Sequence, residues 1–315
     1  MRQFNATVAI NRAIAPDWMH MAFEWPSDLP APKPGQFFTA LPPAVEPGAG
    51  TILRRPFAFA GFEEALTEKD SSLRPRLSYA HSIYQVRGPG TRALASMQPG
   101  SSIDIIAPLG NAFPYPERGE RAIVAGGGIG IGPMLFLAEQ LGTGAYASAG
   151  ESGDAGAGKD TNESSATLVL GFRSASLIPF SGSFSAAGLP SWKRLLEKAF
   201  FSTDDGSAGT HGTVRDALEV LWLQASGLKG LGKKSLDQKK WHLYGCGPGS
   251  MLASLAQFAA QNHMHAHFSA EQWMACGVGA CHGCVLPAVS GGFLRVCADG
   301  PVFEARTIDW EASVQ

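Results

Sequence analysis

Charged side chains are scarce in this sequence of 315 residues: Asp, Glu, Lys and Arg make up 17% of it, against a usual share of about 25%. Basic residues number 25 and acidic residues 27, and no Lys- or Arg-rich stripe runs along the chain. A nucleic acid is therefore not expected as a partner, because phosphate binding needs a basic surface. Hydrophobic residues make up 45%, the norm for globular proteins, which excludes wholesale disorder.

Long apolar runs are also missing. Residues 122–138 carry no charge, but several glycines and Pro133 interrupt them, which indicates a strand, a glycine loop and a helix rather than a membrane span. The first residues, Met1 to Ala6, lack the apolar segment of a secretion signal. We therefore expect a cytoplasmic protein without a membrane span, in which disulfide bonds are disfavoured.

The first part of the chain, residues 1–116, has the pattern of a β domain. Alternating apolar residues predict a strand near residues 4–10. Further short strands are expected near residues 19–25, 36–41, 52–60, 76–86 and 102–107. These strands and one short helix near 91–97 favour a closed antiparallel β-barrel, because closure removes exposed sheet edges.

Residues 117–262 instead alternate strands with helices, which predicts a parallel sheet covered by helices. The expected strands are 122–125, 166–172 and 241–244, and the expected helices are 132–141, 213–224 and 248–261. Stretches near 142–165 and 225–240 have the composition of solvated insertions, and we expect the first to be poorly ordered. Residues 263–315 form a third part, too small to hold much of a core, that carries four of the five cysteines.

The cysteines of the third part have a specific spacing. Four, two and twelve residues separate Cys276, Cys281, Cys284 and Cys297. This matches the plant-type 2Fe-2S arrangement, in which one loop supplies three thiolates and a distant strand the fourth. Zinc and disulfides compete with this interpretation, although zinc sites usually show two knuckles with two-residue gaps. Cys246 lies upstream in the second part and is not expected to be a cluster ligand.

A glycine-rich strand-to-helix segment suggests a nucleotide site. Its glycines include Gly127, Gly128 and Gly130. The N-terminus of the following helix offers free N–H groups and a positive dipole end to a pyrophosphate. The spacing is not the strict G-x-G-x-x-G, so on this motif alone a tight structural turn stays open. Cys246 and Gly247 lie in a second such segment, as expected when two loops flank one nucleotide at the carboxyl ends of parallel strands.

Four stretches resemble the ferredoxin reductase family, and within it the electron-transfer subunits of NAD-dependent dihydroorotate dehydrogenases. They are residues 53–56 (LRRP), 126–130 (GGGIG), 202–207 (STDDGS) and, most specifically, 274–281 with 296–303 (MACGVGAC, VCADGPVF). The resemblance covers nearly all of the chain except the two insertions. It implies a β + α/β architecture with an antiparallel FAD-binding β-barrel, a parallel-sheet NAD-binding domain and a small C-terminal 2Fe-2S domain.

The same resemblance implies roles for residues of the barrel. Arg55 would face the FAD pyrophosphate, and the flavin would lie along Arg55, Pro56, Phe57 and Ala58. Backbone groups and a ring for the flavin would come from Ile83, Tyr84 and Gln85. A phosphate would lie at Gly90 and Thr91, where a helix begins.

The resemblance also implies an activity. Electrons would pass between NAD(H), FAD and a 2Fe-2S cluster, to or from a separate FMN-containing dihydroorotate dehydrogenase catalytic subunit in pyrimidine (UMP) biosynthesis. The two subunits would form a hetero-oligomer, with a heterotetramer as one arrangement. Because no residue resembles a base for dihydroorotate, the orotate chemistry would belong to the partner, and no catalytic residue is assigned on this chain.

Two other functions stay open at this stage. One is the electron-transfer subunit of another flavin and iron-sulfur reductase, of the ferredoxin-NADP or sulfur reductase type. The other is a zinc-stabilised nucleotide-binding regulator without redox activity. Ala58 is the feature that favours the regulator, because the family usually has Ser or Thr there, and Gln272-Trp273 stands where the family more often has an Arg before the Met.

Several polar residues receive a secondary interpretation. His263, His265 and His267 alternate, so on a strand they would share one face and could bind a metal, although a solvated face or a partner contact also explains them. His282 is interpreted as a surface or partner-facing side chain. For Asp204 and Asp205, a turn or a role at the NADH ribose is favoured over acid-base chemistry.

Overall fold

A computed structural model describes residues 1–43, 53–64, 77–117, 119–142, 166–184, 189–225 and 241–313. The two insertions expected near 142–165 and 225–240, and the disorder expected for the first, lie outside these residues. Among the described residues, helices that are both long and apolar enough to cross a membrane are absent.

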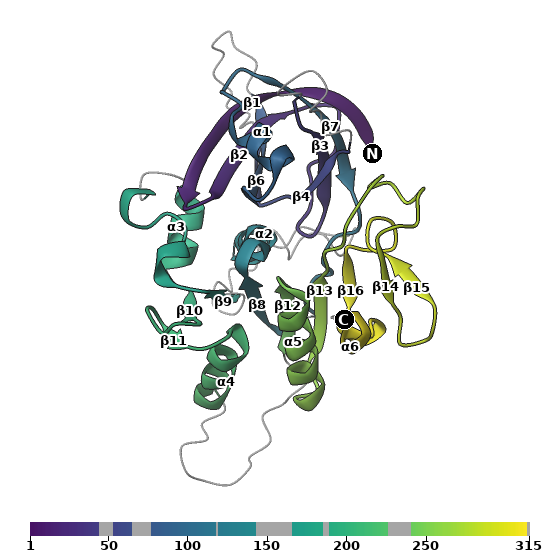
Figure 1. Ribbon diagram of the computed structural model, residues 1–315. Helices are drawn as coiled ribbons and strands as arrows, with labels where there is room; N and C mark the ends of the chain where they lie inside the picture. The colour runs from purple at the N-terminus through teal and green to yellow at the C-terminus, as the bar shows by residue number, and fades with distance from the viewer. Residues whose placement is uncertain are drawn as a thin grey trace, which may run out of the picture.

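The N-terminal part is an antiparallel sheet of seven strands, in the order β4-β3-β7-β1-β2-β6-β5. The strands are β1 (Arg2–Ala15), β2 (Trp18–Trp25), β3 (Phe37–Leu41), β4 (Arg55–Ala58), β5 (Gly61–Glu63), β6 (Ser78–Gln85) and β7 (Ser102–Leu109). The sheet curls into the half-barrel at the top of Figure 1. The predicted closure is wrong for the described residues, because the edge strands β4 and β5 do not pair with each other; instead the hydroxyl of Ser82 on β6 donates to the carbonyl of Ala58 on β4 at 2.9 Å. Helix α1 (Pro89–Ala95) leads into β7.

The interior of the barrel follows from the two-residue period of its strands. Along β7 every second side chain is buried, so Ile103 and Ile105 point into the barrel, while the partly buried Ile106 packs on the core beside α4 and α5. Phe23, Phe38 and Phe59 pack against them as a cluster of rings with centroids 5.0 to 5.1 Å from Phe38. The barrel therefore has a core of its own, as the sequence pattern predicts.

The second sheet also has seven strands, in the order β11-β10-β9-β8-β12-β13-β16, with only β16 antiparallel to its neighbour. Its strands are β8 (Arg121–Gly127), β9 (Thr167–Phe172), β10 (Phe200–Thr203), β11 (Thr210–His211), β12 (Trp241–Cys246), β13 (His265–Ser269) and β16 (Val302–Glu304). The sheet thus continues beyond residue 262, where the sequence analysis ended the second domain. The reason is that β13 pairs with β12 from His242 to Cys246.

Helices cover both faces of this sheet. They are α2 (Ile131–Gly142), α3 (Pro190–Glu197), α4 (Val214–Ala225) and α5 (Gly249–Gln261), and α3 was not expected from the sequence. Ile123 on β8 packs in one core with α4 and α5, while its neighbour Val124 packs in the other with α2 and α3. Figure 1 shows α2 between the barrel and the sheet, and its Gly132 lies close enough to the barrel that a Cβ there would be 3.4 Å from Ala60.

The C-terminal part adds a hairpin and two short helical turns beside the sheet. They are β14 (Val285–Pro287), β15 (Phe293–Arg295), the 3-10 helix η5 (Ala305–Thr307) and α6 (Trp310–Ser313). Three more 3-10 turns are η1 (Gly128–Gly130), η2 (Ala175–Leu177) and η3 (Gly182–Phe184). Asn111, just after β7, holds this part to the barrel by donating to the Val302 carbonyl and accepting from its N–H, each at 2.9 Å.

Candidate functional site

The four cysteines of the C-terminal part converge in one loop and its neighbouring strand end. Cys284 and Cys297 are buried, Cys276 is partly exposed and Cys281 is exposed, and all are free thiols. The Cys281 N–H points at Cys276 Sγ at 3.4 Å, and the Cys297 N–H points at Cys284 Sγ at the same distance. The structure therefore brings together the ligand set that the spacing predicts.

Backbone N–H groups surround these sulfurs, as thiolates bound to iron require. The Gly279 N–H lies 3.1 Å from Cys297 Sγ, and the Val278 N–H 3.5 Å from Cys276 Sγ. Burial opposes ionisation of Cys276, but the N–H groups of Val278 and Cys281 outweigh it and lower its pKa to about 6. A negatively charged cluster fits this surrounding, because the donors favour charged sulfur.

Arg295 at the end of β15 holds the cluster loop in place. Its guanidinium donates to the Gly279 carbonyl at 3.3 Å, and two of its nitrogens bind the Asp299 carboxylate at 3.0 and 3.2 Å. Asp299 also accepts the Arg295 backbone N–H at 2.8 Å. His282 is exposed and its Nε2 lies 3.4 Å from the same guanidinium, so it is a surface side chain rather than a member of the sulfur set.

The cluster loop packs directly on the barrel. Gly277 has a φ of +69°, and a Cβ there would lie 2.7 Å from Thr39 Cγ2 on β3. Thr39 is paired with Pro56 on β4. The cysteine loop thus lies one strand away from the segment Arg55–Ala58, which the resemblance assigns to the flavin.

On the barrel side, β4 and α1 come together. The four residues of β4 are all partly exposed, unlike the buried strands around them. A Cβ on Gly90, in the first turn of α1, would lie 3.1 Å from Arg55 Nε. A guanidinium beside N–H groups of a helix start suits a pyrophosphate. Thr91 Oγ1 accepts the N–H groups of Arg87 and Gly88 at 2.8 and 3.1 Å, which fixes this turn.

The residues of β6 that the resemblance assigns to the flavin are more buried than those of β4. Ile83 and Tyr84 are buried at 5% and 3% exposure, and only Gln85 is partly exposed. The Tyr84 hydroxyl donates to Asn11 Oδ1 at 2.9 Å, and burial raises the pKa of Tyr84. The Tyr84 ring therefore lies in the barrel core, 5.6 Å from the ring of Phe57.

In the parallel sheet, the two glycine-containing loops touch each other. A Cβ on Gly130 would lie 2.2 Å from the Cys246 carbonyl oxygen, and one on Gly127 would lie 2.4 Å from Met251 Sδ. Gly247 approaches as closely, since a Cβ there would lie 3.0 Å from the Gly127 carbonyl oxygen. Only glycine permits this contact at the carboxyl ends of β8 and β12. Gly128 and Ile129 of η1 are partly exposed there, whereas the first residues of α2 are buried.

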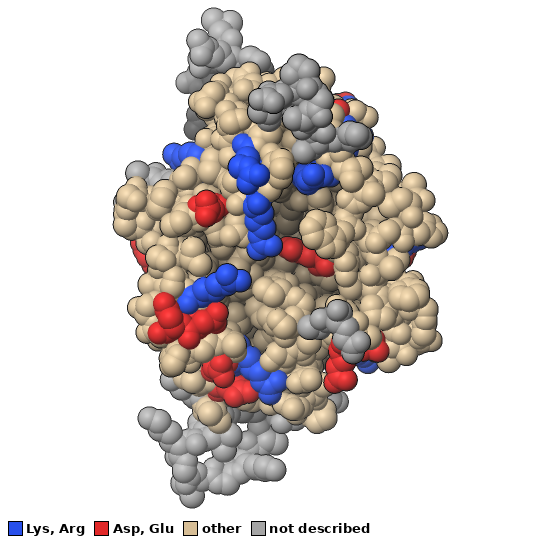
Figure 2. Space-filling model, in the orientation of Figure 1, with Lys and Arg blue, Asp and Glu red and all other residues tan. Residues whose placement is uncertain are grey.

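Asp204 and Asp205 lie in a turn at the carboxyl edge of the parallel sheet. Asp205 accepts the N–H of Ser207 at 3.0 Å in a turn, and the Ser207 hydroxyl accepts the Ala175 N–H at 2.7 Å. This turn follows β10, beside the end of β9, at the carboxyl edge of the sheet. Asp204 lies in the same turn, and its backbone N–H donates to the Phe172 carbonyl at 3.0 Å. Figure 2 shows basic side chains bordering a hollow between the barrel and the parallel sheet.

Sequence reasoning missed the contact of Gly277 with Thr39 and the role of Arg295. Both join segments far apart in the sequence, and only the φ-permissive glycine and the i, i+4 spacing of Arg295 and Asp299 gave a signal.

Comparisons with known proteins agree with this arrangement. Residues 271–309 match the iron-sulfur cluster binding domain of dihydroorotate dehydrogenase B. Among solved structures, an NADH-dependent reduced ferredoxin-NADP oxidoreductase aligns with 98% of this chain and 91% of its own, with a TM-score of 0.67 and 22% identity. Phthalate dioxygenase reductase aligns with 96% of this chain and 77% of its own, with a TM-score of 0.52 and 17% identity. These structures share the fold of this chain, and the matched domain contains its four-cysteine loop, so fold and site define a reductase-like fold with a C-terminal iron-sulfur cluster binding domain.

Curated relatives narrow this class. The electron transfer subunit of dihydroorotate dehydrogenase B (NAD(+)) from Caldanaerobacter subterraneus subsp. tengcongensis is 31% identical over 97% of this chain and 98% of its own. The same subunit from Bacillus caldolyticus is 31% identical over 96% of each chain. The chain belongs to the family of dihydroorotate dehydrogenase B (NAD(+)) electron transfer subunits.

Proposed function

We propose that the chain carries electrons between NAD(H) and the FMN-containing catalytic subunit of a dihydroorotate dehydrogenase, in pyrimidine biosynthesis in the cytoplasm. The observation that carries the proposal is the docking of the four-cysteine loop on β3, next to β4, in a chain whose relatives bear this name. When bound, FAD and a 2Fe-2S cluster supply the chemistry that converts the two electrons of a hydride into single electrons.

The chain's own residues have distinct tasks in this proposal. Cys276, Cys281, Cys284 and Cys297 hold the cluster, and the N–H groups around them stabilise its negative charge. Arg295 keeps the loop closed through Asp299. Because the loop rests on β3, its position relative to the flavin segment is set by packing rather than by a linker.

FAD binds along the barrel in the proposal. Arg55 and the start of α1 at Gly90 and Thr91 take its pyrophosphate, and Pro56, Phe57 and Ala58 border the flavin. Ile83, Tyr84 and Gln85 support it from β6, with Tyr84 acting through the core rather than by direct stacking. Ala58 offers no hydroxyl to the flavin.

NAD(H) binds at the two touching loops. Gly127, Gly128 and Gly130 leave room for the pyrophosphate at the start of α2, and Cys246 and Gly247 border the nicotinamide side. Burial raises the pKa of Cys246, so its thiol stays neutral beside the nucleotide. The turn at Asp205 and Ser207 supplies polar groups for the ribose.

The experiment is an anaerobic visible spectrum of the full chain purified with its catalytic subunit. We expect flavin and iron-sulfur absorbance that bleaches with NADH, and NAD+ reduction by the complex when dihydroorotate is added. Bleaching by NADH without any dihydroorotate-dependent NAD+ reduction would favour another reductase partner. A protein that carries zinc or no chromophore after cluster assembly would overturn the proposal.

A further inference from the structure

A second group of metal-ligand side chains lies at the edge of the parallel sheet opposite the glycine loops. Glu120 directly precedes β8, His242 is the second residue of β12, and His265 is the first residue of β13. These positions are the amino ends of three neighbouring parallel strands, whereas the nucleotide loops follow their carboxyl ends. The group is therefore separated from the nucleotide loops by the length of these strands.

The register of the sheet brings these side chains together. His242 and His265 are direct neighbours across β12 and β13, so they project from the same face. Glu120 Oε2 lies 3.2 Å from His242 Nδ1, and Glu120 Oε1 lies 2.7 Å from His265 Nδ1. One ligand atom from each of the three residues falls within 4.8 Å of the others.

The carboxylate is unusual because it is both buried and incompletely bonded. The side chains of Glu120 and His242 are 4% exposed. Within the described part of the chain, Glu120 Oε1 accepts no hydrogen bond of normal geometry, although the His265 ring is close. A buried carboxylate is costly unless a cation or donors compensate it. The Oε1 atom thus points to a bound cation.

A further histidine orients the central ligand. His242 Nε2 lies 2.9 Å from His267 Nδ1, and the His242 ring stacks on Tyr244 with centroids 4.2 Å apart. When His242 Nε2 carries the proton and donates to His267, Nδ1 has its lone pair free toward Glu120. Metal-binding histidines are held in this way by a partner on the other ring nitrogen.

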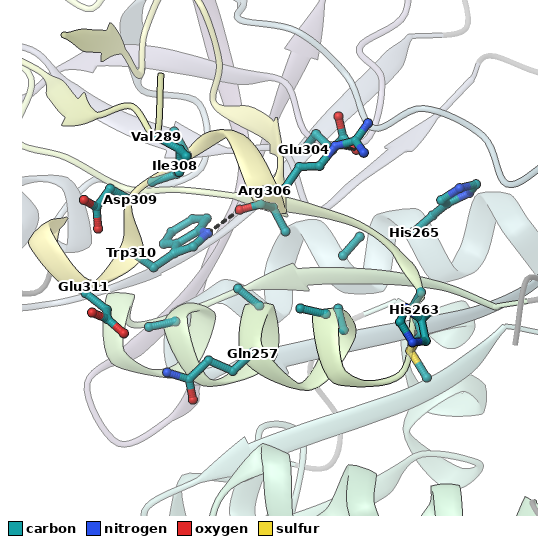
Figure 3. A pocket seen from close by; sticks show the side chains of 17 residues that line it. Gln257, His263, His265, Val289, Glu304, Arg306, Ile308, Asp309, Trp310 and Glu311 are labelled. Carbon is teal, nitrogen blue, oxygen red and sulfur yellow. Dashed lines mark hydrogen bonds and ion pairs between the residues drawn. The ribbon is translucent and has the colours of Figure 1, made fainter. Parts of the chain in front are cut away.

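We propose that Glu120, His242 and His265 form a binding site for a divalent transition-metal ion of the Zn²⁺ type. One carboxylate and two imidazoles are ligands that Zn²⁺ commonly takes, with bonds of about 2.0 to 2.2 Å. The side chain of His265 is 55% exposed, which leaves a route for the ion and a position for water. In Figure 3 His265 and His263 lie at one end of a pocket lined by α5, β13 and α6.

The function of this ion is structural. It joins the segment before β8 to β12 and β13, and so links the central strands of the sheet to the strand that pairs with β16 of the cluster-bearing part. Zn²⁺ has no redox chemistry, so the ion takes no part in electron transfer.

The test is Zn²⁺ binding by the cluster-loaded protein after treatment with a mild chelator. Calorimetric titration with ZnCl2 measures the dissociation constant of wild type, His265→Ala and Glu120→Gln, with His211→Ala as a control at an exposed histidine outside the group. We expect one site whose dissociation constant rises at least tenfold in the first two variants and stays unchanged in His211→Ala. X-ray absorption at the zinc edge should show nitrogen and oxygen ligands only.

Equal Zn²⁺ affinity in wild type and both ligand variants would overturn the proposal. Sulfur scattering at the zinc edge would do the same, because it would place the ion at the cysteines. His265 is largely exposed, so His265→Ala is expected to fold, and its melting temperature in EDTA should equal that of wild type. This comparison separates a lost ligand from a damaged sheet.

Discussion

At the scale of single residues, the four cysteines are unequal. Cys284 and Cys297 are 2% and 4% exposed, whereas Cys281 is at the surface. Burial and the neighbouring Cys284 raise the pKa of Cys297 to about 12, while the pKa of Cys276 is lowered. Without iron, the Cys297 thiol therefore resists ionisation, whereas the Cys276 thiol ionises readily.

Cys284→Ser should abolish cluster binding. A buried serine oxygen is a poor ligand for iron, and we expect iron content and the visible iron-sulfur absorbance to fall by more than about tenfold. Cys246→Ser is the matched control, because Cys246 is also buried but lies in the nucleotide loop. Equal loss of iron in both variants would contradict the assignment.

His20 should give the barrel a pH-dependent stability. It is fully buried, its Nε2 lies 3.0 Å from His81 Nδ1, and Trp192 packs on its ring. Burial, with His81 and Arg12, lowers the pKa of His20 to about 3. The unfolded chain takes up this proton near pH 6.5 and the folded chain only near pH 3, so stability falls as the pH is lowered between these values.

The slope from this one group is at most about 1.4 kcal/mol per pH unit. In His20→Gln the free energy of unfolding should fall less steeply from pH 7 to pH 5. Urea unfolding at pH 7, 6 and 5, followed by circular dichroism, measures this slope. The same slope in wild type and variant would show that His20 is not the titrating group.

At the scale of elements, the contact between two strand-to-helix loops decides whether a nucleotide can bind. The loop after β8 and the loop after β12 approach so closely that a Cβ at Gly130 would overlap the Cys246 carbonyl, at 2.2 Å. Backbone rather than a flexible side chain blocks that space, so any larger residue must push the loops apart.

Gly130→Ala should therefore weaken NADH binding by at least about tenfold, since displaced loops no longer match the pyrophosphate. Flavin reduction by NADH in a stopped-flow experiment measures this effect, and dithionite should still bleach the flavin. Gly142→Ala, in the last turn of α2, is the control, because an added Cβ there meets nothing within 4 Å. Normal NADH kinetics in Gly130→Ala would contradict this role.

At the scale of the whole molecule, electron transfer depends on how the C-terminal part sits on the barrel. Gly277 in the cluster loop packs against Thr39 on β3, next to β4. Asn111 binds the backbone carbonyl and N–H of Val302, which holds the rest of the C-terminal part to the barrel. Electron transfer between the flavin and the cluster requires that the two groups lie close together. The cluster is thus held by the barrel and by the sheet at once.

Gly277→Ala should slow electron transfer from the flavin to the cluster while leaving both bound. Its φ of +69° and the 2.7 Å approach to Thr39 both oppose a side chain. Gly291→Ala is a matched control, since Gly291 has a φ of +88° but no atom within 4 Å of an added Cβ. We expect a several-fold slower cluster reduction only in Gly277→Ala, measured by rapid-mixing absorbance, and equal rates would refute the docking argument.

Trp273 should contribute to binding of the catalytic subunit. It is 92% exposed, three residues before Cys276, and large aromatic side chains are seldom left this open without a partner. Trp273→Ala should keep its flavin and iron but bind the catalytic subunit at least about tenfold more weakly in a pull-down or calorimetric titration. Phe293→Ala, at an exposed ring on β15, tests whether the same surface extends to the hairpin.

Local patterns in the sequence determined the classes of element and the chemistry of the main site. The cysteine spacing, the glycine runs and the change from alternating strands to strand-helix pairs all act within short segments, so they could be interpreted without knowing the fold. Helices α2, α4 and α5 lie within one residue of their expected bounds for this reason.

Only the tertiary structure decided which distant residues meet. The sequence placed His263, His265 and His267 on one strand face, but His263 precedes β13 with a φ of +52° in a turn. Glu120 and His242 join His265 instead, because the pairing of β12 with β13 sets the register across strands. Likewise, β13 joins the parallel sheet and Gly277 meets Thr39 through long-range pairing and packing. A single sequence does not encode such contacts locally, because they depend on the free energy of the whole fold.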